Sequence, residues 1–378
     1  MNFEKAVKEL LKEVADIEIN GNRPWDVQVH DKRVYRRVLH QQSLGLGESY
    51  MEGWWDSQQV DEVMARIIRS RLPQKIKQVK YLYPLLREKF NIVRAMAINY
   101  QNKKRARIVG EKHYDISNDL YRLMLDKRMI YSCAYWQSGS TTLDQAQEAK
   151  LKLICDKVGL KPGQKILDIG CGWGGFAKYA AENYGVEVVG ITISEQQLKL
   201  GKEVCQGLPI ELRLQDYRDL NEKFDHIISI GMFEHVGVKN YQTYMRAAYR
   251  CLKEDGLFLL HTIGNSDSVL KTDPWLHKYI FPNGVIPSIK QIGKAIEGLF
   301  VMEDLHNFGV DYEKTLLCWH DNFLKVWDEI KSKYDQRFYR MWTYYLLTCA
   351  GSFRARDMQL WQIVLSKHGL IGGYKSIR

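Results

Sequence analysis

The sequence predicts an α/β protein with a mostly parallel sheet of seven strands, preceded by a small N-terminal α+β module. From residue 165 onward, short apolar runs alternate with helical segments, which is typical of a parallel sheet with helices on both faces. A glycine-dense turn at 170–175 follows the first run and opens a helical pattern. The 378 residues, 45% of them apolar, suffice for one large domain and a smaller one.

Residues 1–70 are expected to form the small N-terminal module. Residues 3–15 place their apolar side chains on one face of a helix. Residues 17–19 and 26–30 have the pattern of two short strands. The stretch 43–50, with small and aromatic residues, predicts a tight, close-packed corner. The charged N-terminus does not resemble a signal peptide.

Residues 71–107 form a basic amphipathic stretch, which we expect to link the two parts. Such a stretch is suited to binding an anionic lipid surface, because its positive charges contact the headgroups while its apolar face inserts among the acyl chains. A solvated helix face is the alternative. The formal charge of +10 favours an anionic partner, either nucleic acid or an acidic membrane surface. No run approaches the roughly 20 apolar residues that span a bilayer, so a membrane would be visited at its surface.

The region 108–378 is expected to carry the sheet. Leu143–Val158 has the pattern of an amphipathic helix entered from Thr142 and ending at Gly159, and Ser194 is the expected cap of a later helix. Residues of about 310–350 are helical in pattern and rich in Trp and Tyr, which predicts a lid. Strands are predicted at 166–170, 185–193, 210–214, 224–230 and 257–263, and 301–307 and 359–366 would add two more.

The glycine-dense turn indicates which ligand to expect. Gly170, Gly172 and Gly175 match GxGxxG, a dinucleotide fingerprint that is weak evidence by itself. Asp168 precedes the first glycine by two residues, where a carboxylate would repel a pyrophosphate but could hold an ammonium or a hydroxyl. The turn has no basic residue. A cationic ligand with an amino acid head, S-adenosylmethionine, therefore fits the turn better than NAD, which stays the alternative.

Residues that follow the strands are the candidate ligand contacts, since ligands of open α/β sheets lie beyond the carboxyl ends of the strands. After the second strand, where NAD would require an acidic residue, the sequence has Thr192, and only Gln197 could reach in its place. Asp216, after the third strand, could accept a hydrogen bond from an adenine amino group, with Tyr217 beside the ring.

Glu234 and His261 end neighbouring strands and are expected to point into one pocket. A carboxylate and an imidazole together can bind an oxyanion or move a proton. His235 is expected to be structural, since it points the other way if the strand continues. Cys133 could be a small buried residue or a reactive thiol, and no basic neighbour in the sequence lowers its pKa. The seven cysteines occur singly, which argues against a zinc site or a disulfide framework and for a reducing cytosol.

Six stretches, taken together and in order, resemble the bacterial cyclopropane fatty acid synthase family. They lie at 45–55, 131–136, 167–175, 231–237, 259–264 and 349–357. The resemblance implies a Rossmann-like S-adenosylmethionine-dependent methyltransferase fold. It also implies a cytoplasmic enzyme, often a homodimer, attached peripherally to the inner face of the cytoplasmic membrane. Such an enzyme converts the cis double bond of an unsaturated phospholipid acyl chain into a cyclopropane ring, with no nucleic acid as partner.

The same resemblance implies roles for individual residues. The alkene would attack the sulfonium methyl, and the resulting carbocation would lose a proton to a bound bicarbonate ion as the ring closes. Cys349 corresponds to a thiol-reactive cysteine that need not be catalytic. The implied holders of bicarbonate are Cys133, Glu234, His261, Tyr312 and the backbone of Ile263. The implied cofactor residues are Tyr131, Ser132, Gly170, Gly172, Gly174, Thr192, Gln197, Asp216 and Tyr217, beside the Asp168 of the glycine turn.

Two other functions remain open at this point. An RNA or small-molecule methyltransferase on the same fold would also suit the basic charge, although an RNA cytosine enzyme would want a nucleophilic Cys after Pro, and Cys133 follows Ser. The other is a non-catalytic lipid-binding protein. The presence of Glu234, His261 and the glycine turn argues against it. Residues 369–378 are expected to be loose.

Overall fold

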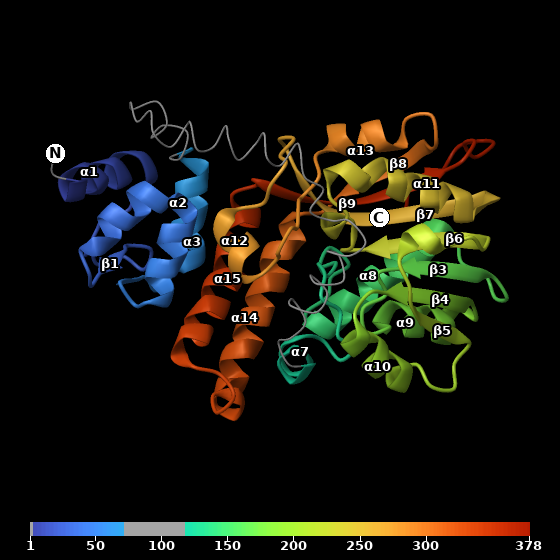
Figure 1. Cartoon of the computed structure of the whole chain (residues 1–378), viewed down its shortest axis with the longest axis horizontal. Helices are drawn as coiled ribbons and strands as arrows, with labels where there is room; N and C mark the ends of the chain where they lie inside the picture. The colour runs from blue at the N-terminus through green and yellow to red at the C-terminus, as the bar shows by residue number, and fades with distance from the viewer. Residues whose placement is uncertain (1–2, 72–117) are drawn as a thin grey trace. The chain divides into compact units, whose positions relative to one another are not determined.

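The protein divides into two compact units, each built from segments that are distant in the sequence (Figure 1). The computed structural model describes residues 3–71 and 118–378. Within them, the first unit comprises 3–71, 270–282 and 312–358, and the second unit comprises the remainder. The helical segment expected as a lid thus groups mostly with the N-terminal residues. Except for Arg71, the predicted basic stretch 71–107 lies outside the described residues.

A seven-stranded, mostly parallel sheet forms the centre of the second unit, which confirms the predicted fold class. Its strand order is β5-β4-β3-β6-β7-β9-β8. The pairs from β5 to β7 are parallel, and β8 and β9 are antiparallel. The order reverses between β3 and β6, where such sheets bind their ligands. The strands are β3 (Lys165–Ile169), β4 (Glu187–Thr192), β5 (Ile210–Leu214), β6 (Phe224–Ile230), β7 (Leu252–Asn265), β8 (Val301–Asn307) and β9 (Met358–Ser366).

Helices cover both faces of this sheet, because successive side chains of each buried strand point to opposite faces. Leu167 and Ile169 of β3 pack in the core formed with α11 and α13, whereas Ile166 packs in the core formed with α8 and α9 (Figure 1). The helices of this unit are α7 (Asn118–Met124), α8 (Leu143–Val158), α9 (Gly175–Tyr184), α10 (Glu195–Val204), α11 (Tyr241–Cys251) and α13 (Ile289–Ile296), with short 3-10 turns at Tyr217–Asp219 (η1), Phe233–His235 (η2) and Val238–Asn240 (η3).

The helix ends of the second unit follow the predicted capping signals. Thr142 accepts a hydrogen bond from the backbone N–H of Gln145, whose side chain caps in return, and Gly159 ends α8 in the left-handed conformation. Ser194 caps α10 by accepting from the backbone N–H of Gln197. Local sequence therefore determines where these two helices begin.

The first unit is mainly helical, with one two-stranded ribbon. The antiparallel strands β1 and β2 pair Gln28 with Asp56 and Val29 with Trp55. Of the strand predicted at 17–19, only Ile19 bridges, to Val27. The elements are α1 (Phe3–Ala15), β1 (Gln28–Val29), α2 (Arg33–Met51), β2 (Trp55–Asp56), α3 (Val60–Arg69), α12 (Pro274–Tyr279), α14 (Val310–Ile330) and α15 (Gln336–Arg354).

The corner predicted at 43–50 is wrong, because this stretch is helical and belongs to α2. The chain bends one residue earlier, at Gln42, where φ is 51° and ψ is −129°. The glycines instead permit close packing: a Cβ on Gly47 would lie 2.4 Å from the Trp275 ring. The predicted close packing is present, but it places α12 against α2 and does not turn the chain.

The segment 369–378 is held in place rather than loose. The Tyr374 hydroxyl donates to the Lys157 carbonyl at 2.8 Å. The Arg378 guanidinium donates to both carboxylate oxygens of Asp304, at 2.6 and 2.8 Å. Asp304 is almost fully buried, so this pairing offsets the cost of its charge.

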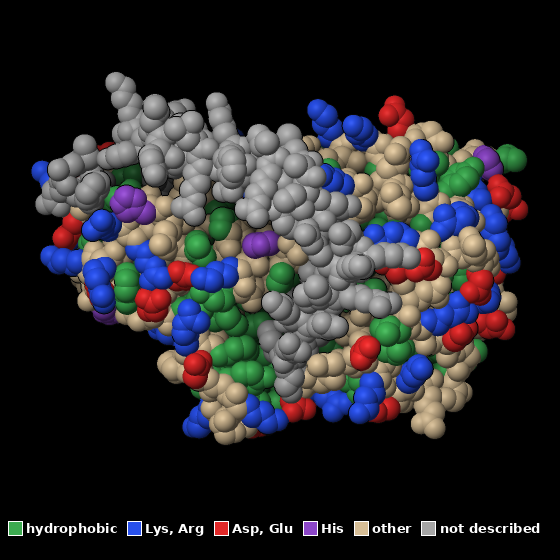
Figure 2. Space-filling model, viewed as in Figure 1, with side chains coloured by type: hydrophobic (Ala, Val, Ile, Leu, Met, Phe, Trp, Pro, Cys, Tyr) green, Lys and Arg blue, Asp and Glu red, His purple; other side chains and the backbone are tan. Residues whose placement is uncertain are grey.

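The described surface carries both signs of charge. On the face drawn in Figure 2, blue Lys and Arg side chains are interspersed with red Asp and Glu side chains. Ion pairs of the second unit include Lys165–Glu222 and Lys253–Asp225. Within residues 3–71 and 118–378, no helix combines the length and the apolar content needed to cross a bilayer.

Candidate active site

The glycine turn lies at the reversal of strand order; it packs against described residues at Gly170, Gly174 and Gly175 and is open toward them at Gly172. Gly170 has φ of 86°, and a Cβ on it would lie 2.7 Å from the Met232 side chain, which follows β6. Gly172 has φ of 55°, and a Cβ there would meet no described atom within 4 Å. Gly174 is the N-cap of α9. As far as residues 3–71 and 118–378 show, the turn is therefore open at Gly172, near the N-terminus of α9, where backbone N–H groups can meet a ligand.

Asp168 lies inside β3, four residues before Gly172 in the sequence. It pairs with Gly190 of β4 and Ile228 of β6, and its side chain is buried. Among the described residues, no hydrogen-bond donor contacts its Oδ2. Burial raises the pKa of Asp168 to about 7, and the ammonium group of Lys150 opposes this shift. A buried carboxylate oxygen without a partner suits a cationic ligand.

The residues after β4 and β5 are at the predicted edge but have partners of their own. The Thr192 hydroxyl donates to Gln197 Oε1 at 2.9 Å. Both carboxylate oxygens of Asp216 accept from Arg218, at 2.7 and 2.6 Å, a contact that the sequence did not suggest. The Tyr217 ring packs into the core, with its centroid 5.0 Å from that of Tyr244. Contacts of these four residues with a cofactor stay predictions.

Glu234 is fixed by a residue on the neighbouring strand. It lies in η2, just after β6, and its Oε1 accepts from the backbone N–H of Ile263 in β7 at 2.7 Å. Its Oε2 is buried and has no hydrogen-bond partner in the part of the chain described here. Burial raises the pKa of Glu234 to about 7, although the bond from Ile263 acts in the opposite direction. Because η2 is a 3-10 turn, the strand does not continue to His235.

His261 lies on β7, next to β6, where it is in register with Ile230. Its Nδ1 is 3.3 Å from the Gln362 side-chain nitrogen, so the amide donates and Nδ1 accepts. Burial lowers the pKa of His261 well below its usual range, and Lys150 and Lys157 add to this effect. The neutral ring then carries its hydrogen on Nε2, which lacks a partner among the described residues. Glu234, in the turn that follows β6, and His261, inside the neighbouring strand β7, thus each have one polar atom without a partner among the described residues.

The segment 130–134 lies against the same edge of the sheet. A Cβ on Gly231, the residue after β6, would be 3.8 Å from that of Ser132. The Tyr131 ring contacts Tyr121, at 5.1 Å between centroids. Cys133 is fully buried, with its thiol 3.2 Å from the Ala134 carbonyl. Ser132 therefore faces the strand end that leads to Glu234.

Two residues of α8 that the sequence reasoning missed hold this segment. The Gln147 amide donates to the Ser132 carbonyl at 2.9 Å, and the Lys150 ammonium donates to the Ser132 hydroxyl oxygen at 2.7 Å. Both side chains are fully buried. Their position in the sequence could have indicated this role. They occupy the apolar face of a predicted amphipathic helix, where a buried polar side chain is unfavourable unless it has a hydrogen-bond partner.

Tyr312 and Cys349 belong to the first unit. The Tyr312 ring stacks on Phe353, with 4.6 Å between centroids. Burial raises the pKa of the Cys349 thiol to about 12, so it is protonated near neutral pH. The contribution of both residues to the chemistry stays a prediction.

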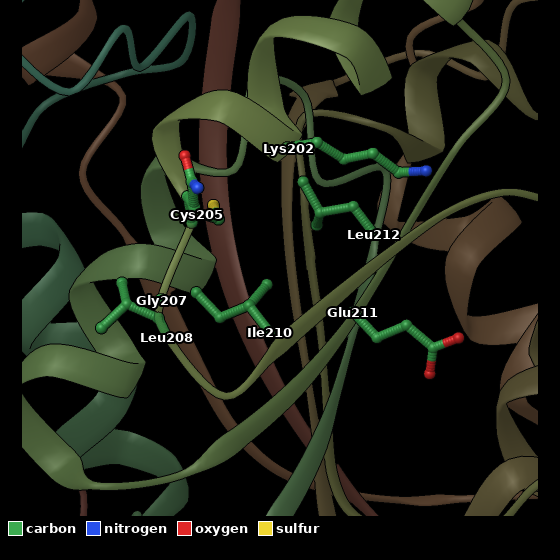
Figure 3. Close-up of a pocket in the computed structure, with 8 residues that line it drawn as sticks. Lys202, Cys205, Gly207, Leu208, Ile210, Glu211 and Leu212 are labelled. Carbon is green, nitrogen blue, oxygen red and sulfur yellow. The ribbon is translucent and has the colours of Figure 1, made fainter.

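A separate pocket lies between the end of α10 and the start of β5 (Figure 3). It has a volume of about 340 Å³, and Cys205, Leu208, Ile210 and Leu212 contribute to its lining. None of the predicted site residues lines it. Because it lies at the amino end of β5, it is not the site at the carboxyl ends of the strands.

The strand order, the glycine turn and the solved structures it resembles define the class of this protein: it is an S-adenosylmethionine-dependent methyltransferase. The cyclopropane synthase MmaA2 from Mycobacterium tuberculosis matches with a TM-score of 0.64 and 32% identity, over 69% of this chain and 98% of its own. The mycolic acid cyclopropane synthase CmaA1, solved with SAH and CTAB, matches with a TM-score of 0.64 and 31% identity, over 69% and 98%.

The chain belongs to the mycolic acid cyclopropane synthetase family, whose model matches residues 101–363. A relative from Escherichia coli strain K12, cyclopropane-fatty-acyl-phospholipid synthase, is 52% identical over 377 residues, which cover 100% of this chain and 96% of the relative. The family predicted from the six motif stretches is thereby confirmed.

Proposed function

We propose that this protein uses S-adenosylmethionine to convert the cis double bond of an unsaturated acyl chain in a membrane phospholipid into a cyclopropane ring. The observation that carries the proposal is the 52% identity, over the whole chain, to a cyclopropane-fatty-acyl-phospholipid synthase. The SAH in the CmaA1 structure supports the choice of cofactor, since SAH is what S-adenosylmethionine becomes after losing its methyl group.

The residues at the glycine turn fit S-adenosylmethionine. When bound, this cofactor supplies the methyl group that becomes the ring carbon. The unpartnered Oδ2 of Asp168 would accept from its ammonium group, and the space at Gly172 admits its bulk. Because the carboxylate lies within β3 between two neighbouring strands, it is held rigidly and does not need to be ordered on binding.

Glu234 and His261 fit a bicarbonate ion that collects the proton released on ring closure. Bicarbonate, when bound, supplies a base close to the reacting carbon. His261 would donate to it from Nε2, and Glu234 would accept its hydroxyl hydrogen at Oε2, the two atoms left without partners. The Ile263 N–H already donates to Glu234, so within the described residues it acts on the ion through that carboxylate.

Water must be kept out, because it would capture a carbocation on the acyl chain. Glu234 and His261 are almost fully buried, and the Phe308 ring packs beside His261 with 5.9 Å between centroids. An aromatic face stabilises a nearby cation without acting as a nucleophile. These side chains provide the dry, electron-rich surroundings that the reaction requires.

The activity is tested by incubating the full chain with methyl-labelled S-adenosylmethionine and vesicles of unsaturated phospholipid. We expect labelled acyl chains that have gained one methylene and have lost the double bond, as seen by mass spectrometry after ozonolysis. Vesicles of saturated phospholipid are the control and should stay unlabelled. A methyl-branched product, or label transferred to RNA and not to lipid, would contradict the proposal.

Membrane attachment through the N-terminal module 1–70 and the basic stretch 71–107 is part of the proposal, as are a homodimer and a place at the inner face of the cytoplasmic membrane. Reversing Lys103, Lys104 and Arg105 to Glu should weaken binding to anionic vesicles by about 100-fold or more, since each basic residue near such a surface contributes about 1 kcal/mol. Vesicle sedimentation measures the change.

A charge-matched variant controls for net charge in that experiment. The exposed lysines Lys161, Lys199 and Lys202 of the second unit, all changed to Glu, alter the total charge equally. This variant should bind anionic vesicles within a few-fold of the wild type. Equal binding by both triple variants would show that residues 103–105 have no special part in attachment.

A further inference from the structure

Lys150 is a buried cation that the reaction described above does not use. It is fully buried on α8, and none of the described carboxylates forms an ion pair with it. Its ammonium group donates to the Ser132 hydroxyl oxygen at 2.7 Å. Removing an ammonium group from water is unfavourable, and burial lowers the pKa of Lys150 to about 8 even though the charges of Asp126 and Asp168 act in the opposite direction. Its hydrogen bond to one neutral hydroxyl therefore leaves the charge incompletely compensated, which makes Lys150 a candidate for a functional role.

The contact with Lys150 determines what Ser132 can do. A serine hydroxyl accepts with its lone pairs and donates one hydrogen. Lys150 uses the acceptor side, and no described residue accepts the hydroxyl hydrogen of Ser132. Gln147 holds the Ser132 backbone carbonyl at 2.9 Å, and Lys150 holds the hydroxyl oxygen at 2.7 Å. The hydroxyl is therefore held as a donor for something that these residues do not supply.

The position of Ser132 shows where that donor is available. Its Cβ would be 3.8 Å from a Cβ on Gly231, at the carboxyl end of β6 and just before Glu234. The charge of Lys150 also lowers the pKa of Asp168, beside the glycine turn, and the pKa of His261, on β7. An O–H donor backed by a buried positive charge recognises an anionic oxygen.

We propose that Lys150 is a positioning residue that, through Ser132, presents an O–H donor and a positive charge to a carboxylate-type oxygen of a bound ligand. The inference rests on the proposed function, in which two ligands have such an oxygen: the amino acid end of S-adenosylmethionine, and bicarbonate. Either source balances the buried charge, and the two are separable by experiment.

The test compares Lys150→Met, Ser132→Ala and the control Lys152→Met, an exposed lysine two residues along the same helix. Each full-length variant is titrated calorimetrically with SAH and with the SAH analogue that lacks the carboxylate, and the bicarbonate dependence of the methyl transfer is measured. A charge-assisted hydrogen bond corresponds to about 10- to 100-fold in affinity. Lys152→Met should match the wild type.

If the cofactor is the ligand, Lys150→Met and Ser132→Ala both lower the affinity for SAH about 10-fold or more and change the affinity for the analogue by less than about twofold. If bicarbonate is the ligand, SAH affinity is kept and the bicarbonate concentration for half-maximal rate rises about 10-fold or more. Both results support the proposal.

Equal weakening of SAH and its analogue, or no change in either assay, would overturn it. If Lys150→Met does not fold, Ser132→Ala still tests the proposal, because this substitution removes only the hydroxyl group. A wild type without bicarbonate dependence would contradict the proposed base, yet the SAH titrations would still test Lys150. The failure of one proposal is thus distinct from the failure of the other.

Discussion

Replacing Glu234 with alanine is expected to lower the rate of cyclopropane formation about 10²- to 10⁴-fold, the usual contribution of a positioned proton-transfer group. The Glu234 carboxylate accepts a hydrogen bond from the Ile263 N–H at Oε1, and its unpartnered Oε2 would hold the bicarbonate ion that acts as the base. The affinity for SAH should change by less than about twofold, because Asp168 and the glycine turn bind the cofactor. Initial rates with labelled methyl donor and a calorimetric SAH titration measure the two quantities.

Glu234→Gln sharpens this test. The amide oxygen can still accept from the Ile263 N–H, but the amide nitrogen places a donor where an acceptor is needed. Because burial raises the pKa of Glu234 to about 7, the accepting, ionised form increases as the pH rises through 7. With bicarbonate held at a saturating concentration at every pH, the wild-type rate should therefore rise between about pH 6 and 8, and the Gln variant should lack this rise. The exposed Glu297→Ala is the control, and ring formation at full speed in Glu234→Ala would refute the role.

Replacing Asp168 with asparagine is expected to move affinity and stability in opposite directions. The SAH affinity should fall about 10- to 100-fold, since a buried carboxylate that accepts from an ammonium is replaced by a neutral amide. The ligand-free protein should become more stable, because burial makes the ionised carboxyl unfavourable and raises its pKa to about 7. Calorimetric titration and thermal unfolding measure the two effects.

The stability gain should depend on pH. Below about pH 4 the carboxyl is protonated in both the folded and the unfolded chain, so the substitution changes little. As the pH rises toward 7, the unfolded chain ionises while the folded chain keeps its proton, and the wild type loses stability. The Tm difference should thus be larger at pH 8 than at pH 5. The exposed Asp255→Asn should show neither effect, and unchanged SAH affinity in Asp168→Asn would rule out the ammonium contact.

Much of this fold follows from short stretches of sequence. The seven strands lie within a few residues of the predicted positions, and the central ones, such as β3 and β4, are apolar runs buried on both faces. The ends of α8 follow from Thr142 and Gly159, whose side chain and backbone conformation act locally. The placement of Glu234 after β6 and of His261 on the neighbouring strand β7 also follows, since strand order at the reversal is general to such sheets.

Other features depend on residues that are distant in the sequence. Gly45 and Gly47 have the composition of a turn, yet their stretch is helical, and Gly47 packs against Trp275, which is distant in the sequence. The bond from Ile263 to Glu234 spans 29 residues, and the bond from Lys150 to Ser132 spans 18. By itself, the sequence determined the sheet, the glycine turn and the family, because these depend on local pattern. Only the tertiary structure decided which polar atoms are paired and which are left for a ligand, because that depends on what burial brings together.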